Sequence, residues 1–328
     1  MEKGLISTFF DIIQSLATAV VVLVYIIYSY FEAFWRLLRP KPAKSLAGEI
    51  ILVTGSGNGI GREICLQLAN SGAKIVCWDI HKGNNDALVK SLRKLGAFAY
   101  GYMVDVSDRS TVECFADKVR KEVGEVTIII NNAGVAPCQE FLKCNPQLVE
   151  HVFKVNVLSH FWILQEFLPN MIECSKGHVV TMCSFAGLKA TRNMVPYNGS
   201  KAAIHGYLES LKSEIRHHPK KPDIKFTTVY PSAVNTRLFK GLCCRFRFPY
   251  FTPVLEPEYV ARHLLNGLKR EIEYVYCPPH IPLYLFLENL IPNKARGAVT
   301  DFLMPLFEPI STTSNKSQLD SHCTSSSL

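Results

Sequence analysis

The cysteines of this chain lack the spacing that marks a metal or redox site. There are 11 of them, an odd number, and none forms a CxxC pair. Their irregular spacing excludes the usual zinc and dithiol motifs and favours reduced thiols on the cytosolic side of a membrane. We interpret most of the cysteines as small core hydrophobes, and we predict no metal site.

Charged residues are also scarce. They make up 20% of the chain, against 48% hydrophobic residues, so part of the apolar excess must lie outside an ordinary soluble core. The net charge is +8, but the basic clusters are not interleaved with a nucleic-acid motif. Nucleic-acid binding is therefore not expected, and a basic face toward anionic lipid is favoured instead.

Residues 12–31 form one long apolar run, broken only by Gln14 and by small or hydroxyl residues. About 20 helical residues span the core of a bilayer. The run lacks the features of a cleaved signal peptide, since Glu2, Lys3 and Asp11 precede it. Aromatic residues and then a basic segment at 36–44 follow it, in the order of an interfacial belt and a positive flank.

We therefore predict a membrane anchor at residues 1–39, with the rest of the chain facing the cytosol. A monotopic or hairpin anchor, which could also enter a lipid-droplet monolayer, and a buried helix of the globular domain are the alternatives. Residues 40–47 are interpreted as a linker to a catalytic domain at 48–275.

A glycine-rich turn follows the first buried strand, predicted at residues 49–54. A helical pattern at residues 62–70 comes next. Glycines between a strand and a helix let the backbone approach a pyrophosphate, and the helix N-terminus offers free N–H groups. The predicted cofactor contacts are Gly55, Ser56, Gly57, Asn58, Gly59, Ile60 and Gly61.

The second strand, at residues 74–79, ends in Asp79. A carboxylate at this position can accept hydrogen bonds from the adenosine ribose and would repel a 2′-phosphate. The neighbouring residues Asn58 and Ile80 are not basic. NAD is therefore the predicted cofactor rather than NADP, although Asp79 as a simple turn residue is the alternative.

Further strands alternate with helices along residues 99–230, and each strand ends in polar or small residues. In an open parallel sheet these carboxyl ends line the ligand crevice. The sequence therefore predicts a single α/β domain of the doubly wound Rossmann type, preceded by the anchor helix.

The segment Tyr197-Asn-Gly-Ser-Lys201 places a tyrosine and a lysine on one face of a helix. An ammonium close to a phenol stabilises the phenolate and is expected to lower the pKa of the tyrosine. Ser184, thirteen residues earlier, can hold a substrate oxygen. These three groups suit proton transfer coupled to hydride transfer at an alcohol or carbonyl.

With these motifs the chain resembles the short-chain dehydrogenase/reductase family in its "classical" form, over roughly residues 46–275. The resemblance implies that Tyr197 is the general acid/base, that Lys201 binds the nicotinamide ribose, and that Ser184 orients the substrate. It implies that Asn156 holds a water linking Lys201 to solvent. It adds further cofactor contacts at Asp105, Val106, Asn132, Ala133, Gly134, Val234 and Thr236.

Two positions depart from the family pattern. Ser232 follows Pro231 where glycine is usual, and Cys183 replaces a frequent serine. The anchor and the start of the domain resemble the 16C-type group, which includes epidermal retinol dehydrogenase 2-like enzymes and lipid-droplet 17β-hydroxysteroid dehydrogenases. The resemblance to this group implies a lipophilic substrate, namely retinol or retinal, a hydroxysteroid or a long-chain alcohol.

The aromatic and basic segment 238–254 occupies the position of the family's substrate loop, and we interpret it as an apolar lid that meets the membrane surface. An apolar extension at 276–310 covers the site, lies on lipid or belongs to the core. A disordered tail is expected at 311–328, which is rich in Ser and Thr.

The expected activity is NAD-dependent interconversion of a lipophilic alcohol and its carbonyl. The alternative is a lipid-surface scaffold that binds nucleotide with little turnover. We expect localisation at the endoplasmic reticulum membrane or lipid droplets, with a homodimer left open.

Overall fold

The computed structural model describes residues 2–239, 242–245, 253–303 and 306–309. The chain divides into two units, Met1–Lys44 and Ser45–Leu328. The first consists mainly of helix α1 (Glu2–Leu38), in which no proline interrupts the backbone hydrogen bonds. Among the described residues it is the one helix whose length and composition suit a bilayer crossing, over Thr8–Arg36.

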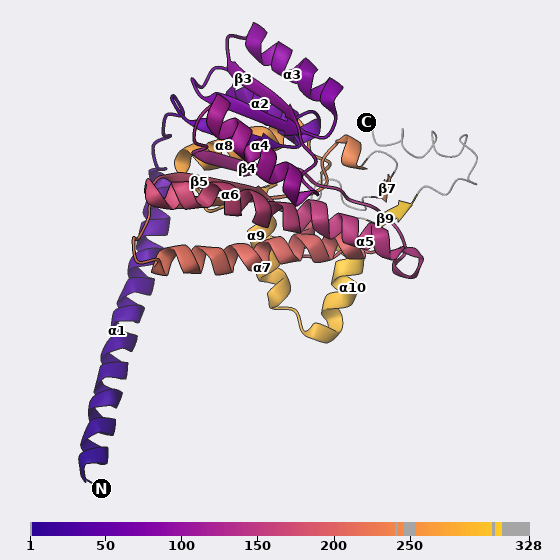
Figure 1. Ribbon diagram of the computed structural model, residues 1–328. Helices are drawn as coiled ribbons and strands as arrows, with labels where there is room; N and C mark the ends of the chain where they lie inside the picture. Colours follow the sequence, from indigo (N-terminus) through magenta and orange to yellow (C-terminus); the bar gives the residue numbers. More distant parts are fainter. Residues whose placement is uncertain (1, 240–241, 246–252, 304–305, 310–328) are drawn as a thin grey trace. The chain divides into compact units, whose positions relative to one another are not determined.

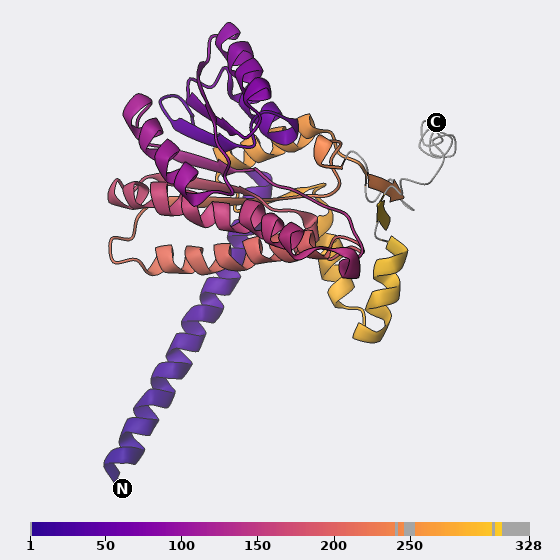
Figure 2. The same cartoon turned by 45° about the vertical axis from the view of Figure 1, so that its right-hand side comes forward.

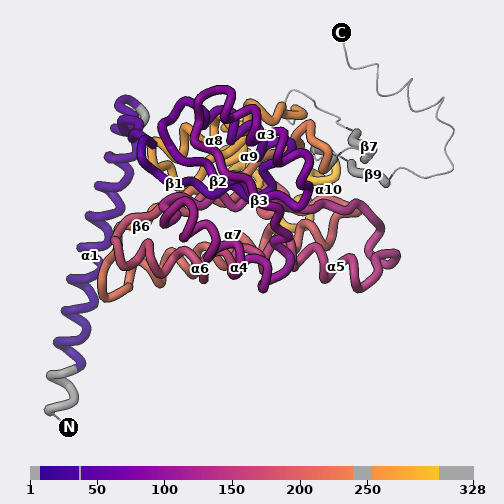
Figure 3. Tube along the Cα trace, turned by 45° about the horizontal axis from the view of Figure 1, so that its top comes forward, coloured from indigo at the N-terminus to yellow at the C-terminus, as the bar shows by residue number. Residues whose placement is uncertain are grey.

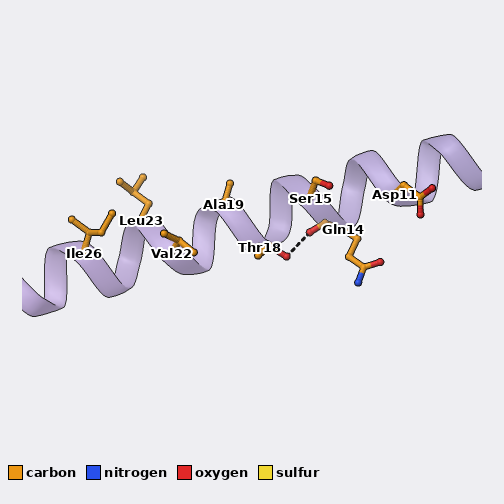
Figure 4. A pocket seen from close by; sticks show the side chains of 8 residues that line it. All are labelled: Asp11, Gln14, Ser15, Thr18, Ala19, Val22, Leu23 and Ile26. Carbon is orange, nitrogen blue, oxygen red and sulfur yellow. Dashed lines mark hydrogen bonds between the residues drawn. The ribbon is translucent and has the colours of Figure 1, made fainter. Parts of the chain in front are cut away.

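Helix α1 carries a group of polar side chains between Asp11 and Thr18. Figure 4 shows one stripe of the helix, on which polar residues between Asp11 and Thr18 give way to apolar ones toward Ile26. The Thr18 hydroxyl donates to the main-chain oxygen of Gln14 at 2.8 Å. Because this hydroxyl is satisfied within its own helix, it does not oppose burial in an apolar surrounding.

The second unit is built on a seven-stranded parallel sheet with the strand order β3-β2-β1-β4-β5-β6-β8 (Figure 1). The strands are β1 (Ile50–Thr54), β2 (Lys74–Asp79), β3 (Phe98–Met103), β4 (Ile128–Asn131), β5 (Gly177–Met182), β6 (Ile224–Pro231) and β8 (Tyr274–Cys277). The order reverses between β1 and β4, and in doubly wound folds this point forms the ligand crevice.

Both faces of the sheet are buried, which explains why its central strands are continuous apolar runs. On β1, Ile51 and Val53 enter the core on one face and Leu52 enters the core on the other. Figure 3 shows α3 and α8 on one side of the sheet and α4, α6 and α7 on the other.

The long helices of this unit are α2 (Gly59–Leu68), α3 (Lys82–Lys94), α4 (Arg109–Glu122), α5 (Pro146–Phe153), α6 (Ser159–Glu173), α7 (Val195–His217), α8 (Pro257–Arg270), α9 (Ile281–Asn289) and α10 (Asn293–Leu303). Short turns are η1 (Phe141–Lys143), the π-helical η2 (Lys154–Leu158), η3 (Phe185–Gly187) and η4 (Arg237–Phe239). Figure 2 shows α9 and α10 as a pair of helices joined by a short turn.

The predicted doubly wound α/β fold and its preceding apolar helix are confirmed. Two details differ from the prediction. Helix α2 begins at Gly59 rather than at residue 62, because the last glycines of the turn already form the first helical turn. Strand β8 was not predicted, and it crosses residue 275, where the sequence predicted the domain to end.

The predicted substrate loop at 238–254 lies largely outside the described residues. Its described part includes β7 (Leu242–Arg245), which pairs antiparallel with β9 (Leu306–Pro309). The predicted tail at 311–328 lies wholly outside the described residues.

Candidate active site

A cavity of about 530 Å³ lies at the carboxyl ends of the parallel strands. Its lining includes most of the predicted site residues, namely Gly55, Asn58, Gly59, Ile60, Asp79, Asp105, Val106, Asn132, Ala133, Gly134, Ser184, Tyr197, Lys201, Val234 and Thr236. Ser56, Gly57, Gly61 and Asn156 do not line the cavity, and their contacts support residues that do.

The glycine turn is held tightly against the sheet. A Cβ at Gly61 would lie 2.1 Å from the main-chain oxygen of Gly55, which no side chain can tolerate. Gly55 itself has φ +64, in the left-handed region that favours glycine. Asn132 donates from Nδ2 to the Thr54 and Gly55 oxygens at 2.9 and 3.2 Å, and Ser56 Oγ lies 2.8 Å from Asn85 Oδ1. The turn is therefore a rigid cradle of main-chain atoms.

Two carboxylates lie at the ends of neighbouring strands. Asp79 accepts hydrogen bonds from the N–H groups of Gly57 at 2.7 Å and His81 at 2.8 Å, so the acid is fixed beside the glycine turn. Asp105 accepts from the Ser107 N–H at 2.8 Å. Each carboxylate oxygen retains a lone pair for a further donor.

Helix α7 carries Tyr197 and Lys201, and Ser184 follows the end of β5. Tyr197 is 5% exposed and Lys201 is 4% exposed. The Lys201 Nζ lies 5.8 Å from the centre of the Tyr197 ring and donates to the Met182 main-chain oxygen at 2.9 Å. Ser184 lines the same cavity as Tyr197, and its side chain lies near enough to the phenol to influence its pKa. The three predicted groups therefore meet at one wall of the cavity.

The expected lowering of the tyrosine pKa is wrong for this structure. Burial raises the pKa of Tyr197 to about 12, and the nearby Ser184 side chain only partly opposes it. Burial also lowers the pKa of Lys201 to about 8. Desolvation dominates because the lysine ammonium donates to the Met182 carbonyl rather than to the phenol.

Asn156 lies in the π-helical turn η2, a type of helix distortion that is frequent at functional sites. Its Nδ2 donates to the Val135 oxygen and to Ser200 Oγ, both at 2.9 Å, and its Oδ1 accepts from the Val135 N–H at 2.8 Å. Ser200 Oγ in turn donates to the main-chain oxygen of Tyr197 at 2.7 Å. The Asn156 side chain thus ties the segment after β4 to α7.

Two contacts around Lys201 had no signal in the sequence. His160 Nδ1 lies 2.8 Å from the Tyr207 hydroxyl, and the two residues are 47 positions apart. Burial, with a smaller contribution from Lys201, lowers the pKa of His160 to about 3, so the ring is neutral. Cys183 Sγ lies 3.3 Å from the Lys201 main-chain oxygen, and burial raises the pKa of this thiol to about 11. Cys183 is therefore a packing group.

Further cavity residues were also missed, among them His151 and Val155. Val155 directly precedes Asn156 in η2, and His151 of α5 lies four positions before Val155, so helical spacing from the neighbour of Asn156 is a signal that could have found His151. Ser232, in place of the usual glycine, lines the cavity, and its N–H donates to the Cys277 oxygen at 2.8 Å.

The fold and cavity together define an α/β protein with a dinucleotide cradle and a Ser-Tyr-Lys wall. The family model for short chain dehydrogenases matches residues 49–243. The chain is 38% identical over 278 residues to human epidermal retinol dehydrogenase 2, covering 84% of this chain and 89% of that protein. It is 36% identical over 288 residues to human 17-beta-hydroxysteroid dehydrogenase 13, covering 88% and 94%.

A solved structure shares the fold. It is a short-chain dehydrogenase/reductase from Burkholderia phymatum in complex with NAD, with a TM-score of 0.68 and 24% identity, covering 81% of this chain and 99% of that one. The chain belongs to the short-chain dehydrogenase/reductase family of oxidoreductases, in the 16C-type group that holds the two human relatives.

Proposed function

We propose that the chain is an NAD-dependent oxidoreductase that interconverts a lipophilic alcohol and its carbonyl. The observation that carries the proposal is the meeting of Ser184, Tyr197 and Lys201 in the same cavity as the glycine cradle. The cradle fits a dinucleotide because the turn is glycine-rich and packed so closely at Gly61 that no side chain can project there, which leaves the backbone open to a pyrophosphate. Bound NAD would supply the hydride acceptor.

In this mechanism Ser184 holds the substrate oxygen, and Tyr197 as phenolate accepts the proton of the substrate hydroxyl. With cofactor and substrate bound, the positive charge of Lys201 would lower the pKa of Tyr197 from the value that burial sets, and Lys201 would bind the nicotinamide ribose. The glycine turn would approach the pyrophosphate, and residues 132–134 would support the cofactor. Asp79, Asp105 and Val106 would contact the adenosine, and Val234 and Thr236 the carboxamide. In the reverse direction Tyr197 returns its proton to the carbonyl oxygen.

The test is Tyr197→Phe. We expect kcat/KM for alcohol oxidation to fall by about a hundred- to ten-thousand-fold, while NADH binding measured by fluorescence is retained. Tyr102→Phe is the matched control. Tyr102 lies on edge strand β3, and its hydroxyl donates to Glu122 of α4 rather than to a residue of the cavity. Equal activity of Tyr197→Phe and the unmutated protein would refute the mechanism.

We propose NAD rather than NADP because Asp79 is fixed beside the glycine turn, where its charge would repel a 2′-phosphate. The nearby Lys82 is paired with Asp86 at 2.8 Å. Asp79→Ala should lower the ratio of kcat/KM for NAD to that for NADP by about ten- to a hundredfold. A preference for NADP in the unmutated protein would overturn this cofactor assignment.

The proposed substrates are retinol or retinal, a hydroxysteroid or a long-chain alcohol. Two observations support a lipophilic class. Tyr197 belongs to an apolar cluster with Ala136 and Met194, against which Cys138 and Ala186 pack. The human relatives are a retinol dehydrogenase and a hydroxysteroid dehydrogenase by name. A panel of these alcohols with both nucleotides would identify the substrate.

We also propose that the protein works at a membrane, of the endoplasmic reticulum or of lipid droplets, with its catalytic domain in the cytosol. Residues 1–39 would be the anchor and 40–47 the linker, and the catalytic domain, predicted at 48–275, would continue to the end of β8 at Cys277. In the extension at 276–310, α9 has one exposed apolar face suited to lipid. It is formed by Leu283, Phe286, Leu287 and Leu290, which are 52–67% exposed.

A further inference from the structure

The inner face of α9 differs from its exposed apolar face. Ile281, Tyr284 and Glu288 follow one another at helical spacing and turn toward the domain. Ile281 is 4% exposed and Glu288 is 5% exposed. A carboxylate this deeply buried requires partners, because an unpaired buried charge is strongly destabilising.

The partners of Glu288 come from two other segments. Lys189 donates from Nζ to Glu288 Oε1, and the side chain of Lys189 is itself only 17% exposed. Thr300 Oγ1 of α10 lies 3.1 Å from the same carboxylate oxygen, and it shares its proton between this oxygen and the Arg296 main-chain oxygen at 2.9 Å. One carboxylate therefore joins α9, α10 and the segment that follows β5.

Lys189 ends the turn that begins at Ser184. The Lys189 N–H donates to the Phe185 oxygen at 2.9 Å, and the Gly187 N–H donates to the Ser184 oxygen at 3.0 Å. The Ala186 N–H donates to Ser184 Oγ at 3.1 Å. A displacement of Lys189 is thus transmitted through a few short hydrogen bonds to Ser184.

This turn, Ser184–Lys189, is packed between α7 and α9. A Cβ at Gly187 would lie 2.7 Å from the main-chain oxygen of Lys201, so the turn contacts α7 directly. On the other side the rings of Phe185 and Tyr284 meet edge to face, with their centres 5.9 Å apart. The Lys189–Glu288 ion pair and the contact between the Phe185 and Tyr284 rings therefore attach the turn to α9.

From this geometry we propose that Lys189 and Glu288 are positioning residues. Their ion pair holds the Ser184–Lys189 turn against α7, which keeps the Ser184 hydroxyl beside Tyr197. The catalytic consequence rests on the proposed function. The effect on the turn itself does not, so the two can be tested separately.

The first experiment measures hydrogen exchange of the main-chain amides in the full-length protein. In Glu288→Gln and in Lys189→Met, we expect exchange at residues 186–189 to increase by about tenfold or more, with no change at residues 55–61. Lys220→Met is the matched control, since Lys220 forms an exposed ion pair with Glu173 between other elements. Unchanged exchange at 186–189 in both variants would overturn the proposal, whether or not the protein oxidises alcohols.

The second experiment measures turnover. In each single variant kcat/KM for a bulky lipophilic alcohol should fall by up to about a hundredfold, while the Kd for NADH is unchanged. The reversed pair Lys189→Glu with Glu288→Lys should recover part of the loss, as expected for two directly coupled residues. Full activity in the single variants, or weaker NADH binding in parallel with lost turnover, would contradict a positioning role.

Discussion

The side chain of His160 takes no part in the proposed chemistry, but its protonation bears on stability. It lies on α6, 2% exposed, against the Tyr207 hydroxyl of α7. Its folded pKa is lowered from 6.5 to about 3, mainly by burial. Below pH 6.5 the unfolded chain therefore binds a proton at this residue that the folded protein does not.

From this difference we expect acid to weaken the fold. Between pH 7 and pH 5 the free energy of unfolding should fall by about 2 kcal/mol through His160 alone. His160→Gln, which can still form a hydrogen bond with Tyr207 but does not titrate, should lose less stability over the same range. Denaturant unfolding of both proteins at the two pH values measures the difference, and identical losses would contradict the assignment.

At the scale of residues, local patterns were predictable and long-range contacts were not. Tyr197 and Lys201 are one helical turn apart, so the sequence alone could place them on one face. Nothing local connects His160 with Tyr207, or Lys189 with Glu288. The direction of the Tyr197 pKa was missed for a related reason, since it depends on how completely the surrounding segments exclude water.

At the scale of elements, the close packing of the turn between β1 and α2 requires a residue without a Cβ at position 61. The Cβ of Gly61→Ala would overlap the Gly55 oxygen and approach Asn132 Nδ2 at 2.6 Å. We expect a loss of stability of about 1–3 kcal/mol together with weaker NADH binding. Thermal unfolding and NADH fluorescence measure the two effects.

Gly83→Ala is the matched control for that substitution. Gly83 lies in α3, and a Cβ there would have no neighbour within 4 Å. Alanine should be neutral or stabilise the helix by up to about 1 kcal/mol. An equal loss of stability in the two variants would show that the close approach at Gly61 is not the cause.

The elements differed in how well the sequence predicted them. Central strands such as β1 and β2 are continuous apolar runs, because helices cover both faces of the sheet. Strand β8 has only four residues and lies at the sheet edge, so its pattern was too short to recognise. The extension after it was predicted as apolar, but its mixture of buried and exposed positions depends on tertiary contacts of α9.

At the scale of the whole molecule, membrane attachment can be separated from catalysis. Removing residues 1–39 should move the protein from the membrane pellet to the soluble fraction, because the apolar segment of α1 is absent. Sedimentation followed by a turnover assay measures both properties. Continued pelleting of the truncated protein would assign attachment to the rest of the chain, and polar substitutions at Phe286 and Leu287 would then test α9.

Helix α9 also bears on how the chain can vary between related proteins. Its nine residues divide between an inner face that contacts the Ser184–Lys189 turn and an outer face that is exposed. Because α1 is expected to carry membrane attachment, changes at Leu283 or Leu290 should affect only the contacts of this outer face and leave turnover intact. Changes at Glu288 should lower turnover and leave the outer face unchanged. The two faces, within less than three turns of one helix, can therefore vary independently.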